Sequence, residues 1–234
     1  MLILKRAITV KNWTHRQRIL LGFGAMILAM IGDYLLGYGT IEMSSEPGAY
    51  MGIAWSTAPD WRYAASSVLG FVSAAMFAAA AVDLLRVLED KYGLAESKLF
   101  RLFRIANWGG ILYFAFIHIA ICMLPVVFNA GMEATGETAA AANMVFRVLK
   151  SIAVPLALGF VVCDGFVTAA WIGMTVRGML PVRKIALLCN PLIIALLGQA
   201  MNCIHNGLDS GFESLGWGLM YLVCAMKLVG KGEK

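Results

Sequence analysis

Residues 19–38 read ILLGFGAMILAMIGDYLLGY, and Asp33 is the single charged side chain in this run. A helix rises about 1.5 Å per residue, so a run of this length covers the roughly 30 Å hydrocarbon core of a bilayer. The run therefore predicts a transmembrane helix near the start of the chain.

Five further apolar runs of similar length follow along the 234-residue chain. The composition agrees, because 60% of the residues are hydrophobic and 14% are charged, whereas soluble proteins carry about 25% charged residues. The runs lack the alternation of polar and apolar residues that marks the strands of a membrane β-barrel. Soluble and disordered proteins are therefore excluded. We expect an all-α fold, a polytopic transmembrane helical bundle of six helices in a single domain over residues 1–234, with helices at about 19–38, 64–85, 105–128, 151–176, 185–204 and 212–229.

The basic residues predict the orientation of this bundle. Of the 19 Lys and Arg residues, all but Arg62, Arg147 and Lys150 lie before the first run, after the sixth, or in the two connections on that same side. Because cytoplasmic segments hold an excess of Lys and Arg, we expect both termini in the cytoplasm and the chain in the inner or plasma membrane of the cell. This clustering assigns the net charge of +5 to membrane topology, and we expect no nucleic-acid partner.

The first two apolar runs are joined by an outer connection, residues 39–61, that contains Tyr50, Trp55 and Trp61. These aromatic side chains either lie at the lipid headgroups or form a lid over a pocket between the helices. A cleaved signal peptide is a competing interpretation of the N-terminus. We expect the first helix to stay as a signal anchor, because its run is longer than a signal-peptide core and no Ala-x-Ala site follows it.

Polar side chains inside the runs are the candidate functional residues, because a charge at the bilayer centre costs at least about 2.5 to 3.5 kcal/mol. Asp33, His118 and Gln199 each lie about 20 Å above the cytoplasmic start of their runs. The spacing of Gln199, Asn202 and Asn206 places the three amides on one face of a helix, and His205 borders that face.

These groups are expected to line an outward-facing polar pocket that binds a ligand. The expected ligand-binding residues are Asp33, Tyr38, His118, Gln199, Asn202, His205 and Asn206. In the competing interpretation, the amide and imidazole groups only form hydrogen bonds that hold the helices together.

Other polar residues receive different interpretations. Asp164 is a secondary intramembrane acid, about 20 Å below the outer surface, expected in the inner half and apart from the pocket. Ser210-Gly-Phe-Glu213 has the pattern of a capping box, so Glu213 and Asp209 are interpreted as helix-cap residues. Asp83 lies three residues before Arg86 and is interpreted as half of a surface ion pair.

Metal and cofactor signatures are weak in this sequence. The five cysteines, Cys122, Cys163, Cys189, Cys203 and Cys224, all fall in predicted helices without a C-x-x-C pair, which is typical of small buried apolar residues. Haem ligation by His118 and His205 is disfavoured because the two histidines lie at different predicted heights. We therefore expect no metal and no cofactor.

Two family resemblances add to this interpretation. The run Gly32-Asp-Tyr-Leu-Leu-Gly-Tyr38, followed by Pro59-Asp-Trp-Arg62, Leu69-Gly70 and His118 before Leu124-Pro125, resembles an uncharacterised family of bacterial multi-pass membrane proteins, a domain of unknown function. That resemblance covers about residues 22–225 and implies a topology but no reaction. Gly32, Asp33 and Leu36 also resemble a run of the lysoplasmalogenase family, which implies eight crossings and chemistry by membrane-embedded acids.

Three functions follow as hypotheses, and whether the protein is an enzyme stays undecided. In the leading one, the pocket binds a membrane lipid or an amphiphilic small molecule. In the second, the protein is an intramembrane lipid hydrolase in which Asp33 or Asp164 activates water and His118 acts as acid or base. In the third, the protein is a small-molecule transporter in which Asp33 and Asp164 occupy mirror-image depths of an inverted repeat. Membrane lipid is the expected partner, and a second copy of the chain is a further candidate.

Overall fold

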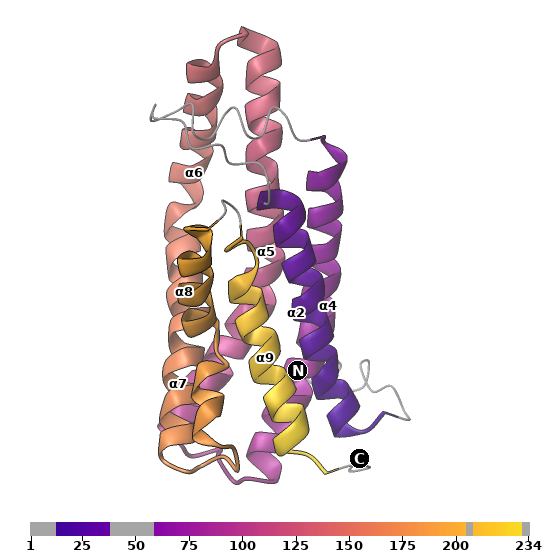
Figure 1. Cartoon of the computed structure of the whole chain (residues 1–234), viewed down its shortest axis with the longest axis vertical. Coiled ribbons are helices and arrows are strands. Elements are labelled where there is room, and N and C mark those ends of the chain that lie inside the picture. Colours follow the sequence, from indigo (N-terminus) through magenta and orange to yellow (C-terminus); the bar gives the residue numbers. More distant parts are fainter. Residues whose placement is uncertain (1–12, 38–58, 205–207, 231–234) are drawn as a thin grey trace.

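The protein is an all-helical membrane bundle (Figure 1). The computed structural model describes residues 13–37, 59–204 and 208–230, and these residues contain no strand. Four helical rods, His15–Gly37, Trp61–Asp90, Lys98–Thr135 and Thr138–Val176, are long and apolar enough to cross a membrane. With two shorter helices they make six rods, so the predicted all-α bundle of six helices is confirmed.

The six rods follow one another with few breaks. The first three are α2 (His15–Gly37), α4 (Trp61–Asp90) and α5 (Lys98–Thr135). The fourth rod is α6 (Thr138–Phe160), which continues through the π-helical turn η1 (Val161–Gly165) into α7 (Phe166–Val176). After the 3-10 turn η2 (Lys184–Leu188) come α8 (Pro191–Asn202) and α9 (Phe212–Lys227).

Helix α9 occupies the centre of the arrangement, between α2 and α8 (Figure 1). Glycines permit this close packing. A Cβ atom added at Gly22 of α2 would lie 2.2 Å from the Tyr221 ring of α9. A Cβ added at Gly216 of α9 would lie 2.6 Å from the Asn190 carbonyl oxygen, where α8 begins. Because α9 fits only where its neighbours present no side chain, it is fixed in register against both of them.

The α5–α6 hairpin is longer than the sequence predicts. Residues 129–150 were expected to form a connection, but α5 runs to Thr135 and α6 starts at Thr138. Gly136, with φ of +68°, makes the turn between them. The hairpin has a hydrophobic core of its own, composed of Leu124, Phe128, Ala141 and Val145. It therefore extends beyond the end of α2 in Figure 1.

The two C-terminal helices are shorter than their apolar runs. The fifth run was expected to be helical from residue 185, but α8 begins only at Pro191. Asn190 caps it, since its side chain accepts a hydrogen bond from the Ile193 amide at 3.0 Å. Helix α8 has 12 residues and α9 has 16, so they rise about 18 and 24 Å, each less than the thickness of a bilayer core. Their junction therefore lies within the length of the bundle.

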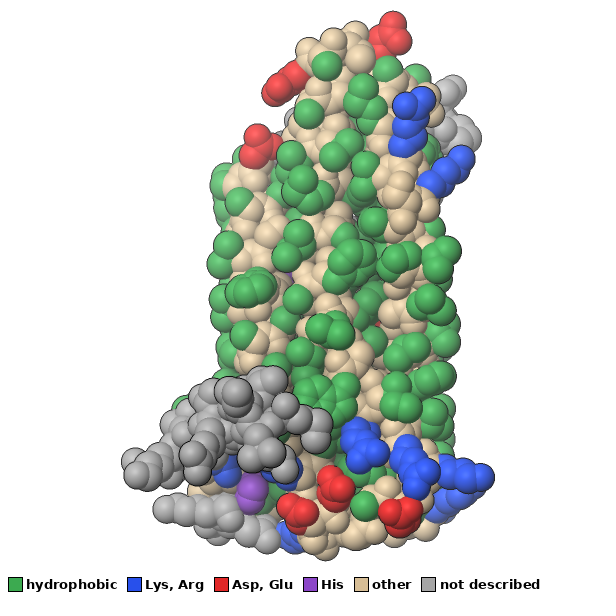
Figure 2. Space-filling model, turned by 180° about the vertical axis from the view of Figure 1, so that it is seen from behind, with side chains coloured by type: hydrophobic (Ala, Val, Ile, Leu, Met, Phe, Trp, Pro, Cys, Tyr) green, Lys and Arg blue, Asp and Glu red, His purple; other side chains and the backbone are tan. Residues whose placement is uncertain are grey.

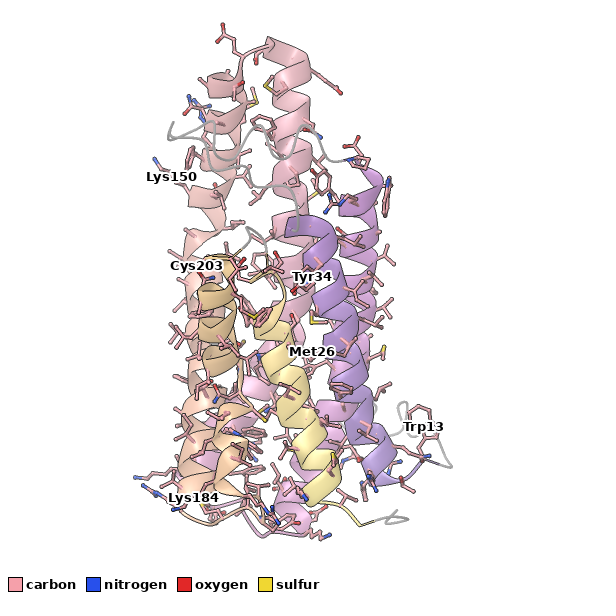
Figure 3. All side chains as sticks on the ribbon, in the orientation of Figure 1. Trp13, Met26, Tyr34, Lys150, Lys184 and Cys203 are labelled. Carbon is pink, nitrogen blue, oxygen red and sulfur yellow. The ribbon has the colours of Figure 1, made fainter. Side chains whose placement is uncertain are left out.

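The surface has the pattern of a membrane protein. Figure 2 shows a broad apolar band, with Lys and Arg side chains gathered at its lower end. Trp13 and Lys184 lie at that lower end in Figure 3, and Lys150 lies towards the other. The start of α2 and the end of α9 are both at the lower end, so the two described ends of the chain are on the same side (Figure 1). That this side is cytoplasmic stays a prediction.

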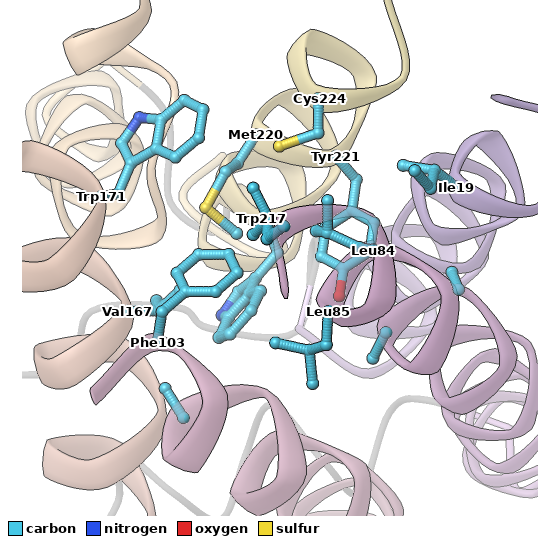
Figure 4. Close-up of a cluster of buried hydrophobic side chains, with 14 of the residues drawn as sticks. Ile19, Leu84, Leu85, Phe103, Val167, Trp171, Trp217, Met220, Tyr221 and Cys224 are labelled. Atoms are coloured by element: carbon cyan, nitrogen blue, oxygen red, sulfur yellow. The ribbon is translucent and has the colours of Figure 1, made fainter. Parts of the chain in front are cut away.

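The core lies in the lower half of the bundle, where five rods meet (Figure 4). Its largest members are Trp171, Trp217 and Tyr221, all with no exposed surface. Each satisfies its polar atom: the Tyr221 hydroxyl donates to Asn107 Oδ1, and Trp171 Nε1 donates to the Ala186 carbonyl at 2.8 Å. These hydrogen bonds fix the orientation of the aromatic rings.

The interpretation of Asp83 as half of a surface ion pair with Arg86 is wrong. Asp83 is buried, and its partners are in α2: Arg18 Nε lies 3.0 Å from Oδ1 and His15 Nδ1 lies 2.8 Å from Oδ2. The reason is that α2 and α4 pack side by side and antiparallel, which brings the first turn of α2 against the last third of α4.

The cysteines differ in exposure more than the sequence predicts. Cys122, Cys163 and Cys224 are buried, as expected for small apolar residues. Cys189 is half-buried because it lies in the break before α8, and Cys203 is exposed at the end of that helix. All five are free thiols.

Candidate functional site

A cavity of about 320 Å³ lies between α2, α5, α8 and the start of α9. One part of its wall is polar and consists of Asp33, His118, Gln199, Asp209, Ser210, Glu213 and Ser214. The other part is apolar and includes Met26, Ala29, Leu36, Phe114, Ile117 and Ile121. The cavity thus combines hydrogen-bonding groups with apolar side chains inside a membrane bundle.

Asp33 and His118 meet at this cavity. His118 Nε2 lies 3.2 Å from Asp33 Oδ1, which is ion-pair distance between α5 and α2. The imidazole fits there because two neighbouring helices present glycines: a Cβ at Gly70 would lie 2.3 Å from His118 Cγ, and one at Gly32 would lie 3.2 Å from Nε2. His118 is only 7% exposed, and among the described residues no group makes a well-aligned hydrogen bond to Nε2.

The other oxygen of Asp33 is held by the last helix. Ser214 Oγ donates a hydrogen bond of 2.8 Å to Asp33 Oδ2. Ser214 lies in the first turn of α9, so this bond ties α9 to α2 at the level of the cavity. Asp33 is thereby oriented from two sides, by a hydroxyl and by an imidazole.

A second acid pair borders the cavity. Asp164 is fully buried, and Trp217 Nε1 donates to its Oδ1 at 2.7 Å. The Asp164 carboxyl is also a hydrogen-bonding partner of the Glu213 carboxyl, and Glu213 lines the cavity. Two carboxyl groups in hydrogen-bonding contact share a proton, so this pair carries at most one negative charge. The expectation that Asp164 lies apart from the pocket is therefore wrong, because Glu213 connects the two.

Asp164 owes its position to an irregular turn. It lies in the π-helical segment Val161–Gly165, which interrupts the long rod between α6 and α7. A π-helical turn adds a residue to the helix and so changes the face on which the next side chains lie, and such turns are frequent at functional sites. Nothing in hydropathy or spacing predicts this turn.

The four central groups lie at one depth. Asp33, His118, Asp164 and Glu213 are each 13 to 15 residues from a basic residue at the lower end of the bundle, namely Arg18, Arg104, Arg177 and Lys227 respectively. This separation corresponds to roughly 20 to 22 Å of helix. The polar wall therefore lies past the middle of a 30 Å core, towards the end opposite the basic residues.

Gln199 lies at the edge of the cavity, where its Nε2 donates a hydrogen bond of 2.7 Å to Asp209 Oδ2. The other members of the predicted amide face are not placed at the site. Asn202 is the last residue of α8, and its side chain is outside the described part of the structure. Tyr38, His205 and Asn206 also lie outside the described residues. Of the seven predicted ligand-binding residues, the structure thus brings together Asp33, His118 and Gln199.

The predicted capping box is wrong. The N-cap of α9 is Gly211, with φ of +79°, and it makes no side-chain capping bond. A Cβ at Gly211 would lie 2.7 Å from Met30 Cγ of α2, so the close approach of α2 sets the left-handed turn. Glu213 is consequently free of a capping role and reaches Asp164. Asp209 bonds to Gln199 and does not cap α9.

The sequence reasoning missed Glu213 and Ser214 as site residues. One signal could have found Glu213: it lies four residues before Trp217, so both side chains are on the same face of α9. That face meets Asp164 in the structure. Ser214 has no comparable signal, because its contact with Asp33 depends on how α9 packs against α2.

The chemistry open to this site follows from these groups. Within the described residues, no group of three or more His, Cys, Asp or Glu side chains is arranged to hold a metal ion. The polar wall can accept hydrogen bonds from a head group through its carboxylates, and the Asp33–His118 pair can exchange a proton. The apolar wall can contact the hydrocarbon part of the same molecule.

Comparisons with known proteins place the chain in context. A family model, described as a family of unknown function (DUF6796), matches residues 6–231. No curated protein and no solved structure matches the chain.

Proposed function

Because the chain belongs to this family of unknown function, which supplies no activity, we propose from the geometry of the cavity that the protein binds a lipid or another amphiphilic molecule. The polar head of the ligand contacts Asp33, His118 and Glu213, and its hydrocarbon part lies against the apolar wall. The polar and apolar halves of one 320 Å³ cavity are the observation that carries this proposal. Pockets of about 300 to 1,000 Å³ with a few polar groups are typical of small-molecule sites.

His118 supports the proposal independently. Its Nε2 is buried at the cavity without a well-aligned hydrogen bond among the described residues. A buried polar group left unsatisfied costs about 1 to 3 kcal/mol. A ligand head group that reaches Nε2 would remove this cost, so the empty cavity favours occupation by a molecule with a polar end.

The experiment is mass spectrometry of the amphiphiles that stay bound to the purified protein. Ala195→Phe fills the cavity from α8, because Ala195 lines it. Ala139→Phe, on the exposed surface of the hairpin, is the matched control. We expect Ala195→Phe to lose the bound molecule and Ala139→Phe to keep it. Equal retention by the two variants would refute the proposal.

A second candidate function is an intramembrane lipid hydrolase, and the Asp33–His118 contact favours it. A carboxylate at 3.2 Å can orient an imidazole as a general base for a water molecule, and Ser214 fixes that carboxylate. Lipid turnover in proteoliposomes, followed by mass spectrometry of the products, separates this candidate from binding alone. In the hydrolase, Asp33→Asn abolishes product formation; a wild-type protein that yields no product eliminates it.

A further inference from the structure

We infer that the head group bound in the cavity is a cation, a protonated amine or a quaternary ammonium; this rests on the proposed function. The acids of the cavity wall carry the first part of the argument. Asp33, Asp209 and Glu213 line the cavity, and Asp164 lies directly behind Glu213. No Lys or Arg is among the residues that line it.

The charges of these groups do not cancel. If His118 is protonated, it balances Asp33, its neighbour at 3.2 Å. The Asp164–Glu213 pair, which shares a proton, keeps up to one negative charge, and Asp209 contacts the neutral Gln199 amide. If His118 is neutral, Asp33 adds a further negative charge. In both cases the wall is negative, and an uncompensated charge inside a membrane protein is unfavourable.

The nearest basic side chains of the described residues are used elsewhere. Arg62 Nε donates to the Leu35 carbonyl at 2.8 Å, at the end of α2. Arg147 and Lys150 belong to a separate pocket on α6. The protein therefore supplies no fixed cation to the cavity from these positions, and the ligand is the available source of positive charge.

A second observation, independent of the acids, indicates that the cavity accepts a ligand. His118 is more than nine-tenths buried, lines the cavity, and has no well-aligned hydrogen-bond partner for Nε2 among the described residues. An ammonium group beside it would donate to the Asp33 and Glu213 carboxylates, which are on adjacent helices. The Phe114 ring in the apolar wall provides a further favourable surface for a cation. A phosphate or carboxylate head would instead meet like charges.

The test compares three probes that share a dodecyl chain with a photoreactive diazirine and differ only in the head group: amine, alcohol and carboxylate. The protein is kept in a neutral maltoside detergent at pH 7, and labelled peptides are mapped by mass spectrometry. We expect the amine to label the cavity helices about tenfold more efficiently than the carboxylate, with the alcohol between them. Glu213→Gln and Asp33→Asn are expected to reduce amine labelling to the level of the alcohol.

Glu133→Gln is the control variant, because it removes one acid from the exposed end of α5, far along the hairpin from the cavity. It is expected to leave the ratio of amine to carboxylate labelling unchanged. Size-exclusion profiles establish that each variant is folded, and two independent cavity variants keep the test valid if one of them is not.

The outcomes separate the two proposals. If all three probes label the cavity equally and Ala195→Phe removes the labelling, the amphiphile site stands and the inference of a cationic head is overturned. If no probe labels the cavity above the level of Ala195→Phe, the proposed function itself fails.

Discussion

His118 is placed by the absence of a side chain on a neighbouring helix. A Cβ at Gly70 would lie between 2.3 and 2.4 Å from three atoms of His118, so α4 contributes only backbone at this level. This space holds the imidazole against Asp33 at the cavity wall. The position of the candidate site residue therefore depends on a glycine that itself touches no ligand.

Gly70→Ala is expected to destabilise the protein by about 1 to 3 kcal/mol, because a well-packed site must shift to admit the methyl group. Gly24→Ala is the control: a Cβ there meets only the flexible end of Met76, at 3.7 Å. Thermal unfolding in detergent provides the measurement. A melting temperature equal to that of the Gly24→Ala variant would show that His118 is not confined by Gly70.

The Trp217–Asp164 hydrogen bond gives a second prediction for single residues. Trp217→Phe removes the donor at 2.7 Å and leaves a buried carboxyl oxygen unsatisfied. Trp171→Phe removes a bond of similar length to a neutral carbonyl, that of Ala186. Because bonds to a carboxylate are the stronger, we expect Trp217→Phe to lose more stability, by about 1 kcal/mol. The comparison uses the two unfolding curves, and equal losses would speak against a charged Asp164.

At the scale of single residues, the sequence predicts part of the site. Asp33, His118 and Gln199 share a height along their helices, which is calculable from their positions, and all three line the cavity. Glu213 is not predictable as a site residue, because the Ser210–Glu213 pattern is also that of a helix cap. Only the packing of Gly211 on Met30 removes the cap and directs Glu213 inward.

Helical elements differ in how far hydropathy predicts them. The long apolar rods are predicted because membrane spans are defined by length and hydrophobicity. The ends of α5 and α6 are missed, because the hairpin beyond the apolar runs is stabilised by its own small core. The π-helical turn at Asp164 is missed as well, since it depends on tertiary contacts and not on composition.

The start of α9 gives a prediction about an element. Gly211→Ala places a methyl group in a left-handed conformation and also 2.7 Å from Met30 Cγ. Gly178→Ala meets the first problem alone, because its φ is +66° and no atom lies within 4 Å. We expect Gly178→Ala to cost about 1 to 2 kcal/mol and Gly211→Ala more than that. Differential thermal unfolding measures both, and equal costs would mean that α2 does not set the start of α9.

For the whole molecule, charge and shape agree. Basic side chains gather at the end of the bundle where both described chain ends lie, and the α5–α6 hairpin projects from the other end (Figures 1 and 2). If this basic end is cytoplasmic, as the distribution of Lys and Arg predicts, the cavity opens towards the outer half of the membrane.

This orientation is testable with cysteines introduced at the two ends. In a variant without native cysteines, Glu133→Cys at the hairpin is expected to react with a membrane-impermeant maleimide on intact cells. Lys184→Cys, at the opposite end, is expected to react only after the membrane is permeabilised. The reverse pattern would invert the bundle and place the cavity towards the inner half.

The most direct test of the amphiphile site is an experimental structure of the protein purified in lipid nanodiscs. We predict elongated density in the cavity between α2, α5, α8 and α9, ending within hydrogen-bonding distance of Asp33, His118 and Glu213. A cavity closed by side chains, or one without density while lipids are resolved elsewhere on the bundle, would contradict the account.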